Sequence, residues 1–417
     1  MKEVIKRIIG SNGLDVIRRM KMYIKCLDAF RIGNSERIDI HDGIELIDCI
    51  SLKKKHVYFG YYDIQQFNKN VDKLLVHIVP FKSKTHRDPI EIAYYDLKSK
   101  RLNTIGFTKA WSWQQGSRLR WHPIHMDYVL YNNISDGDYV CQIVDILSGK
   151  VLRQIPMALY DVDSQFKVGL GVNFSRLQRL RPGYGYNSLP DNTKNENIPL
   201  NDGIIKYDLI NNKKELIISY EKLAKDIDDP KMQHYINHIS ISPSGDKFMF
   251  FHIWTQGAGM RWNVRLYVSD MNGDNLKILE EKNTISHYAW KNNDVLLTTK
   301  INREFEGSCY CEYDVNTGER KIIGGEELKF DGHPTLFKDR QKFISDTYSL
   351  SGYLQHVFKY NTVNGEYIPM LDIYHNPRMY EEMRCDLHPR LTPDNKLFTI
   401  DTVYSKCKRS VLIFKIR

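Results

Sequence analysis

Four histidines occur at matching positions in successive repeats of the chain. They are His238, His287, His333 and His388, at intervals of 49, 46 and 55 residues. Ten residues after each histidine comes an apolar residue in a strand-like run, namely Phe248, Leu297, Phe343 and Phe398. One imidazole per structural repeat predicts side chains that converge on a common axis. Imidazole can remove or donate a proton near neutral pH and can bind a metal ion, so the pattern predicts a site for chemistry.

Two of these histidines and a nearby aspartate form a candidate metal group. Asp386 lies two residues before His388, and side chains two apart on an extended strand point to the same side. His333 begins the neighbouring repeat. Two imidazoles and a carboxylate suit a divalent ion such as Mn or a similar metal. The alternative is structural, because a buried histidine must find hydrogen-bond partners and can serve to join two neighbouring repeats.

A second cluster departs from the repeat and contains residues suited to bind an anionic ligand. Arginine forms paired hydrogen bonds with carboxylates, and tyrosine can stack on sugars or donate a proton to them. This loop predicts a binding site, with Asn237 as a further ligand-binding residue near the same mouth; the alternative is a solvated basic loop. The loop candidates, all within residues 173–186, are Arg176, Arg179, Arg181, Tyr184 and Tyr186.

The elements that would position these residues are short strands joined by tight turns. The turns combine Asp or Asn with Gly, which tolerate the left-handed backbone that hairpins need. They recur at 95–100, 144–149, 207–212, 269–273, 312–318 and 360–365. A period of about 40–50 residues with several strands per unit is typical of a β-propeller. The sequence therefore predicts an all-β fold, a seven-bladed β-propeller.

The blade count depends on the two ends of the chain and on one insertion. Inner strands are expected to begin near Tyr61, Arg118, Tyr160, His238, His287, His333 and His388. The last unit is too short for four strands, so the alternating segment 44–50 is expected to complete it and close the ring. Extra length around the polar stretch 187–199 is assigned to an insertion rather than to an eighth blade.

Residues 1–40 are predicted to be a helical N-terminal extension to the propeller at 41–417. Apolar residues recur there at helical spacing, with Lys and Arg on the other faces of the expected helices. Such a helix either packs against the propeller or makes peripheral contact with an anionic membrane surface. We expect no transmembrane segment and no signal peptide. Seven cysteines without a paired pattern favour a cytoplasmic location.

The chain carries a net charge of +9, which favours an anionic partner. The basic residues are dispersed and no nucleic-acid-binding motif is present, so we expect an anionic oligosaccharide and no nucleic acid.

The His-Pro pairs, each followed by a polar turn, resemble the oligogalacturonate lyases and the wider TolB-type propellers. The resemblance covers about residues 56–417. It implies a manganese-type ion held by histidines, with His333 and His388 as ligands, and cleavage of uronate-containing chains by β-elimination. Where that family has His-Pro-His, this chain has Asp386-Leu387-His388, and Met383 stands at the position of a glutamine ligand.

Such a lyase needs a group that binds the uronate carboxylate, a base and an acid. The arginines of the loop are candidates for the first role, His238 or His287 for the base, and Tyr184 or Tyr186 for the acid. The competing hypothesis is a non-catalytic propeller that binds a glycan or a protein and is accessory to polysaccharide metabolism.

Overall fold

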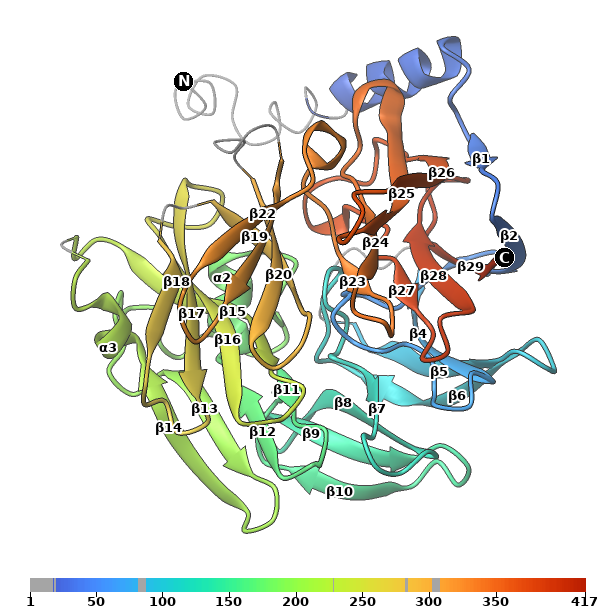
Figure 1. The fold of residues 1–417 in the computed structure, drawn as a ribbon. Helices are drawn as coiled ribbons and strands as arrows, with labels where there is room; N and C mark the ends of the chain where they lie inside the picture. The colour runs from blue at the N-terminus through green and yellow to red at the C-terminus, as the bar shows by residue number, and fades with distance from the viewer. Residues whose placement is uncertain (1–17, 19, 82–87, 228, 282–283, 302–307) are drawn as a thin grey trace.

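The computed structural model describes residues 18, 20–81, 88–227, 229–281, 284–301 and 308–417. Within them, seven antiparallel sheets surround a common centre, as Figure 1 shows. This arrangement confirms the predicted seven-bladed β-propeller.

The blades follow one another along the chain, each with its innermost strand first. Blades 1 to 3 are β3 (Lys55–Tyr58), β4 (Lys73–Pro80), β5 (Ile90–Asp96) and β6 (Arg101–Thr108); β7 (Arg120–Trp121), β8 (Tyr128–Ser135), β9 (Asp138–Asp145) and β10 (Val151–Ile155); and β11 (Asp161–Val162), β12 (Val168–Gly171), β13 (Gly203–Asp208) and β14 (Lys213–Ser219). Blades 4 and 5 are β15 (Gln233–Ile241), β16 (Lys247–Thr255), β17 (Trp262–Asp270) and β18 (Lys277–Glu280); and β19 (Ile285–Trp290), β20 (Val295–Lys300), β21 (Tyr310–Asp314) and β22 (Arg320–Ile323).

The last two blades each take a strand from the N-terminal part of the chain. Blade 6 is β23 (Thr335–Leu336), β24 (Lys342–Asp346), β25 (Leu354–Asn361), β26 (Tyr367–Tyr374) and, outermost, β1 (Ile38–Ile40); blade 7 is β27 (Arg390–Leu391), β28 (Leu397–Thr402), β29 (Ser410–Ile416) and, outermost, β2 (Ile44–Ile50). β2 thus pairs with the C-terminal strand, while β1 brings residues from within 1–40 into the propeller.

The helices of the described chain are short. α2 (Phe174–Leu180) lies in the connection between β12 and β13, which is the insertion expected in this blade, and α3 (Tyr220–Ala224) follows β14. Three 3-10 turns occur in the last third of the chain: η1 (Glu326–Leu328), η2 (Ser351–Tyr353) and η3 (Glu381–Met383). Residues 20–31 form the helix of the N-terminal segment. None of the helices within the described residues is long and apolar enough to cross a membrane.

In each outer hairpin, a side-chain oxygen accepts a hydrogen bond from a backbone N–H of the turn, and this bond stabilises the turn. The first Asp of each hairpin accepts a hydrogen bond from the backbone N–H two or three residues later. In blade 6 an asparagine does the same. The residues that act in this way are Asp96, Asp145, Asp208, Asp270, Asp314 and Asn361. This local bond fixes the turn chemistry that the repeat predicts.

The hydrophobic core lies between neighbouring blades rather than within one of them. Leu75 of blade 1 shares a fully buried cluster with Val129 of blade 2, and Leu371 of blade 6 shares one with Leu412 of blade 7. Each sheet is therefore buried on both faces, which fixes the positions of the inner strands.

The innermost strands leave regular pairing at the register of the repeating histidines. In β15 the pairing with β16 is interrupted between Asn237 and Ser240, and His238 has φ +59°. His388 and Arg118 occupy matching places with φ +48° and +53°. A left-handed residue within a strand produces a bulge, which re-aims its side chain. His238 lies in such a bulge, whereas His388 and Arg118 stand two residues before β27 and β7.

Candidate functional site

The four histidines gather around one tyrosine. The ring centroid of Tyr61 lies 5.0 Å from that of His388, 5.1 Å from that of His238, 6.2 Å from that of His333 and 6.4 Å from that of His287. All five side chains are buried. The repeat therefore brings the imidazoles together as the sequence predicts, but an aromatic ring from blade 1 fills the space between them.

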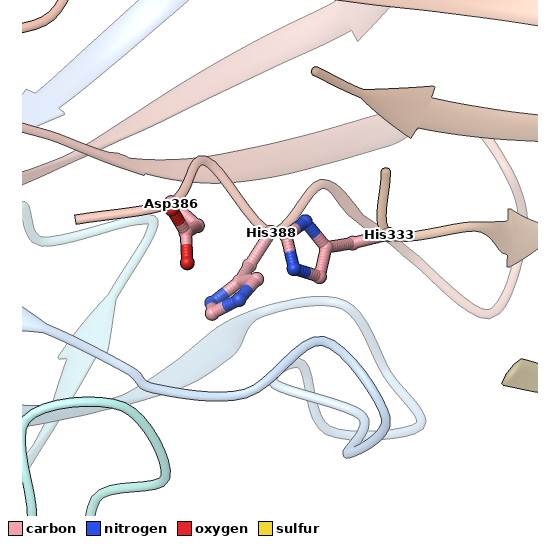
Figure 2. Close-up of side chains that lie close together, drawn as sticks. All are labelled: His333, Asp386 and His388. Atoms are coloured by element: carbon pink, nitrogen blue, oxygen red, sulfur yellow. The ribbon is translucent and has the colours of Figure 1, made fainter. Parts of the chain in front are cut away.

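Two of these histidines and Asp386 form the candidate metal group (Figure 2). One ligand atom from each of His333, Asp386 and His388 lies within 4.8 Å of the others, and all three residues are buried. The Nδ1–H of His333 donates to Asp346 Oδ1 (2.7 Å), and that of His388 donates to the Gly60 carbonyl (2.7 Å). The Nε2 atom of each ring is buried and has no partner among the described residues.

The pKa values of the three side chains in the candidate metal group are shifted in different directions. Burial disfavours the charged form of His333, but the Asp346 carboxylate outweighs it and raises the pKa. Burial, reinforced by His333, holds the pKa of His388 well below its usual value. Burial alone would raise the pKa of Asp386, yet the guanidinium of Arg384 lowers it. Arg384 donates to both carboxylate oxygens of Asp386, at 2.7–3.0 Å.

These residues fit a divalent ion. Each imidazole presents a buried, unpartnered Nε2, and each Nδ1 is held by an acceptor that fixes the ring in the way known for metal-binding histidines. The Asp386 oxygens already accept from Arg384, so they would share their lone pairs with an ion. Met383 packs against the buried aromatic cluster that contains Trp113 and belongs to no metal-binding group of the described residues.

We predict that His388→Ala lowers the metal content of the purified protein. Removal of one of three ligands costs affinity, because two neighbours alone make a weak site. Elemental analysis after dialysis should find a divalent ion in the natural chain and at least about tenfold less in the variant. His375→Ala, which removes a buried histidine outside the group, is the matched control and should keep the metal. A metal-free natural chain whose melting temperature does not change on addition of Mn or Zn would contradict a metal site.

Two neighbouring cavities open at the end of the propeller where the histidines lie. The larger is about 490 Å³ and the smaller, which reaches His238 and His287, about 180 Å³. Both are lined by Arg181, Tyr184, Tyr235 and Trp262. The smaller cavity is also lined by Asn237, His238, Ser286, His287, Asp331 and Tyr348. These shared lining residues place the two cavities next to each other.

Arg181 is the cation that faces both cavities. Its guanidinium lies over the rings of Tyr184 (5.2 Å) and Trp262 (5.4 Å). Among the described residues, no carboxylate forms an ion pair with it within 4.0 Å. A guanidinium held between two aromatic rings, with its donors free toward a cavity, can bind a carboxylate or another anion.

The other residues predicted from the same loop lie outside the cavities. Arg176 is buried, and its three nitrogens donate to the carbonyls of residues 193, 196, 197 and 234. Arg179 forms an ion pair with Asp191 (2.7 Å). Tyr186 is fully buried, stacks on Phe174 and accepts a hydrogen bond from Asn132. These three side chains hold the insertion together. The segment is therefore not a solvated loop, since α2 folds back against blade 4.

The predicted base candidate His287 lines the smaller cavity together with Asp331, a carboxylate absent from the predicted set. The Nδ1–H of His287 donates to Asp331 Oδ1 (2.9 Å), and its Nε2 lies 3.4 Å from the Tyr348 hydroxyl. Burial and the neighbouring His333 lower the pKa of His287, although Asp331 opposes the shift. The ring is therefore neutral at pH 7, with its proton on Nδ1 and its basic Nε2 beside the hydroxyl of Tyr348. Asp331 stands two residues before His333, the same spacing that singles out Asp386.

His238 is arranged differently. Its Nε2 accepts a hydrogen bond from Asn237 Nδ2 (3.1 Å), while its Nδ1 has no partner among the described residues. Burial holds its pKa well below the usual value. The Asn237 carbonyl oxygen accepts from Gln115 and from Tyr160. The Nε2 of His238 is held by an amide at 3.1 Å, and no carboxylate of the described residues bonds to its ring. His287 has only the Tyr348 hydroxyl near its Nε2, at 3.4 Å, and is oriented by Asp331, so it is better suited to accept a proton from a ligand.

The fold and site define a seven-bladed propeller with a histidine-lined cavity at one end. Among solved structures, the chain is similar to an oligogalacturonate lyase in complex with manganese, with a TM-score of 0.61 and 13% identity over 92% of this chain and 98% of that one. It is also similar to the oligogalacturonate lyase of Vibrio parahaemolyticus, with a TM-score of 0.58 and 10% identity over 91% and 98% of the two chains.

A third similar structure is a β-propeller domain with a different name. The propeller domain of Cps50 (Swd1) from Myceliophteria thermophila gives a TM-score of 0.50 and 12% identity over 89% of this chain and 100% of that domain. No protein-family model and no curated protein matches the sequence. The resemblance to the oligogalacturonate lyases is thus confirmed for the fold, and at these identities for the fold alone.

Proposed function

We propose that the protein is a lyase that cleaves short uronate-containing oligosaccharides by β-elimination in the cytoplasm. The observation that carries this proposal is the placement of Arg181 and the Asp331–His287 pair on one cavity. The first can bind a carboxylate and the second can accept a proton. Both functions are needed at adjacent atoms of a uronate, which carries its acidic C5–H next to the carboxylate. The net charge of +9 favours the same anionic ligand.

The residues of the cavity account for each bond that changes. Arg181 binds the uronate carboxylate and stabilises the charge that develops when C5 loses its proton. Nε2 of His287 takes that proton, while Asp331 holds the ring orientation and stabilises the imidazolium. The C5–H electron pair forms the C4–C5 double bond, and the C4–O bond breaks. A phenol, Tyr184 or Tyr348, donates its proton to the leaving oxygen.

A divalent ion is part of the proposal only as a supporting charge. Held by His333, Asp386 and His388, it would supply electrostatic stabilisation to the bound carboxylate. One of the similar structures is an oligogalacturonate lyase in complex with manganese, which makes manganese the first metal to test.

Arg181→Gln is expected to weaken binding of an acidic oligosaccharide. Loss of a charge-assisted pair costs roughly 1.5–3 kcal/mol, so Kd should rise about 10- to 100-fold. Isothermal titration with a uronate trisaccharide measures the change. Arg101→Gln removes the same charge from an exposed position of β6 and should leave Kd unaltered. Equal Kd values for both variants would show that the ligand does not use Arg181.

The competing function is a propeller that binds an anionic glycan without cleaving it. Tyr186, one of the predicted acids, lies outside the cavity. The acid role therefore falls to Tyr184 or Tyr348. A screen of acidic oligosaccharides separates the two functions, because elimination creates a conjugated double bond that absorbs in the near ultraviolet. Binding with rising absorbance supports the lyase. Binding without absorbance supports the binding module.

A further inference from the structure

The helix of residues 20–31 has one face that packs against the propeller. Ala29 is fully buried, and Asp28 accepts a hydrogen bond from the hydroxyl of Tyr353 in η2 (3.1 Å). Arg18 forms an ion pair with Glu381 of η3 (3.3 Å). Figure 1 shows this helix beside β25 and β26. This face of the helix therefore packs against the propeller, which is one of the two predicted alternatives.

A second face of the same helix is apolar and exposed, and Met20, Tyr23 and Ile24 on it border a cavity of about 570 Å³ together with Arg378 and Tyr380. The large side chains of this face are between 52% and 75% exposed and recur at i, i+3, i+4, i+7 and i+10, which places them on one stripe. The five side chains of this stripe are Met20, Tyr23, Ile24, Leu27 and Phe30. Contiguous exposed apolar side chains of this size usually mark an interaction surface. The helix therefore has one face that contacts the propeller and a second, apolar face that is exposed.

The charge around this stripe points to the kind of partner. Among the described residues 18 and 20–33, four are Lys or Arg and one is Asp, which gives a net charge of +3. Lys21 and Lys25 are exposed and flank the apolar stripe at helical spacing. Apolar side chains bordered by cations suit the headgroup region of a bilayer that contains anionic lipids. Two copies of the same cationic segment would repel each other, which disfavours a second copy of this chain as the occupant.

We propose that this helix anchors the protein to an anionic membrane surface. Within the described part of the chain this helix is not long and apolar enough to cross a membrane, so it would lie in the interface with the apolar stripe among the acyl chains. Glu381, to which Arg18 is paired, lines the larger cavity. The anchored protein therefore holds this cavity beside the lipid surface. This inference does not depend on the reaction proposed for the cavity.

The test is sedimentation of the full-length protein with vesicles. We expect binding to vesicles of phosphatidylcholine with phosphatidylglycerol, little binding to phosphatidylcholine alone, and weaker binding at high salt. Ile24→Asp with Leu27→Asp should reduce the bound fraction about tenfold or more, because the stripe no longer enters the interface. Ile210→Asp with Val363→Asp, two equally exposed apolar positions on outer hairpins, is the matched control and should bind like the natural chain.

Thermal melts of both double variants establish that each is folded. If Ile24→Asp with Leu27→Asp lowers the melting temperature, Lys21→Glu with Lys25→Glu tests the same surface without inserting charge into the apolar stripe. Failure of the natural chain to bind anionic vesicles would overturn the proposal. So would a dimer in sedimentation velocity that the Ile24 and Leu27 changes dissociate, since a second copy would then cover the stripe.

Discussion

His287→Gln is expected to lower kcat on a uronate oligosaccharide by about 100- to 10,000-fold, the usual contribution of a positioned base. Glutamine keeps the size and polarity of the side chain but cannot accept the C5 proton. The Kd for the ligand should change little, because Arg181 and the aromatic walls of the cavity remain. The absorbance of the unsaturated product gives kcat, and titration gives Kd.

His238→Gln is the matched comparison for His287→Gln. Its Nε2 already accepts from Asn237, so the variant should retain most of the activity. A large loss in His238→Gln together with an active His287→Gln would reverse the assignment of the base.

The pH profile adds a second readout for the same base. The pKa of His287 is lowered, so Nε2 stays unprotonated below pH 6.5, the usual imidazole pKa. Activity should persist as the pH falls through 6.5 and decline only when the lowered pKa is reached.

Deletion of residues 1–52 is expected to destabilise the whole propeller, whereas deletion of residues 1–30 should be tolerated. The longer deletion removes β2, whose Ile44 and Ile50 are buried against β28 and β29. Burial of these side chains and Leu46 stabilises the fold by about 5 kcal/mol or more. The melting temperature of the longer deletion should therefore lie at least about 5 °C below that of the shorter one.

The two deletions control for each other. Both remove most of the N-terminal helix, so their difference measures the strands β1 and β2 and the residues that join them. Blade 7 without β2 exposes the backbone edge of β29, and this variant should also aggregate more readily on heating. Equal melting temperatures would mean that the pairing of β2 with β29 contributes nothing to the ring.

The fold could be predicted because each blade repeats the same local chemistry. Asp96, Asp145 and their counterparts fix the outer hairpins through bonds to nearby backbone, and such bonds can be read from sequence spacing. The closing strand could be predicted because 44–50 alternates and the last blade lacks one strand. The bulge at His238 and the left-handed backbone of His388 could not be predicted, since nothing in a histidine indicates a positive φ.

The site was only partly accessible from the sequence. The repeat predicts that the four histidines converge, and the spacing of Asp386 and His388 predicts that they lie together. The role of Arg176 depends on carbonyl acceptors from residues 193–197, which no spacing brings to it. The central position of Tyr61 likewise depends on the path of the chain after β3.

The most direct test of the proposed reaction is the mass of its products. β-Elimination splits a uronate oligosaccharide into two fragments whose masses sum to that of the substrate, because no water is added. Mass spectrometry after incubation with the purified natural chain should find this sum, with the unsaturated sugar on one fragment. Fragments that together contain one added water would identify a hydrolase, and an intact bound substrate would identify a binding module. Either result would contradict the assignment of His287 as the base of an elimination.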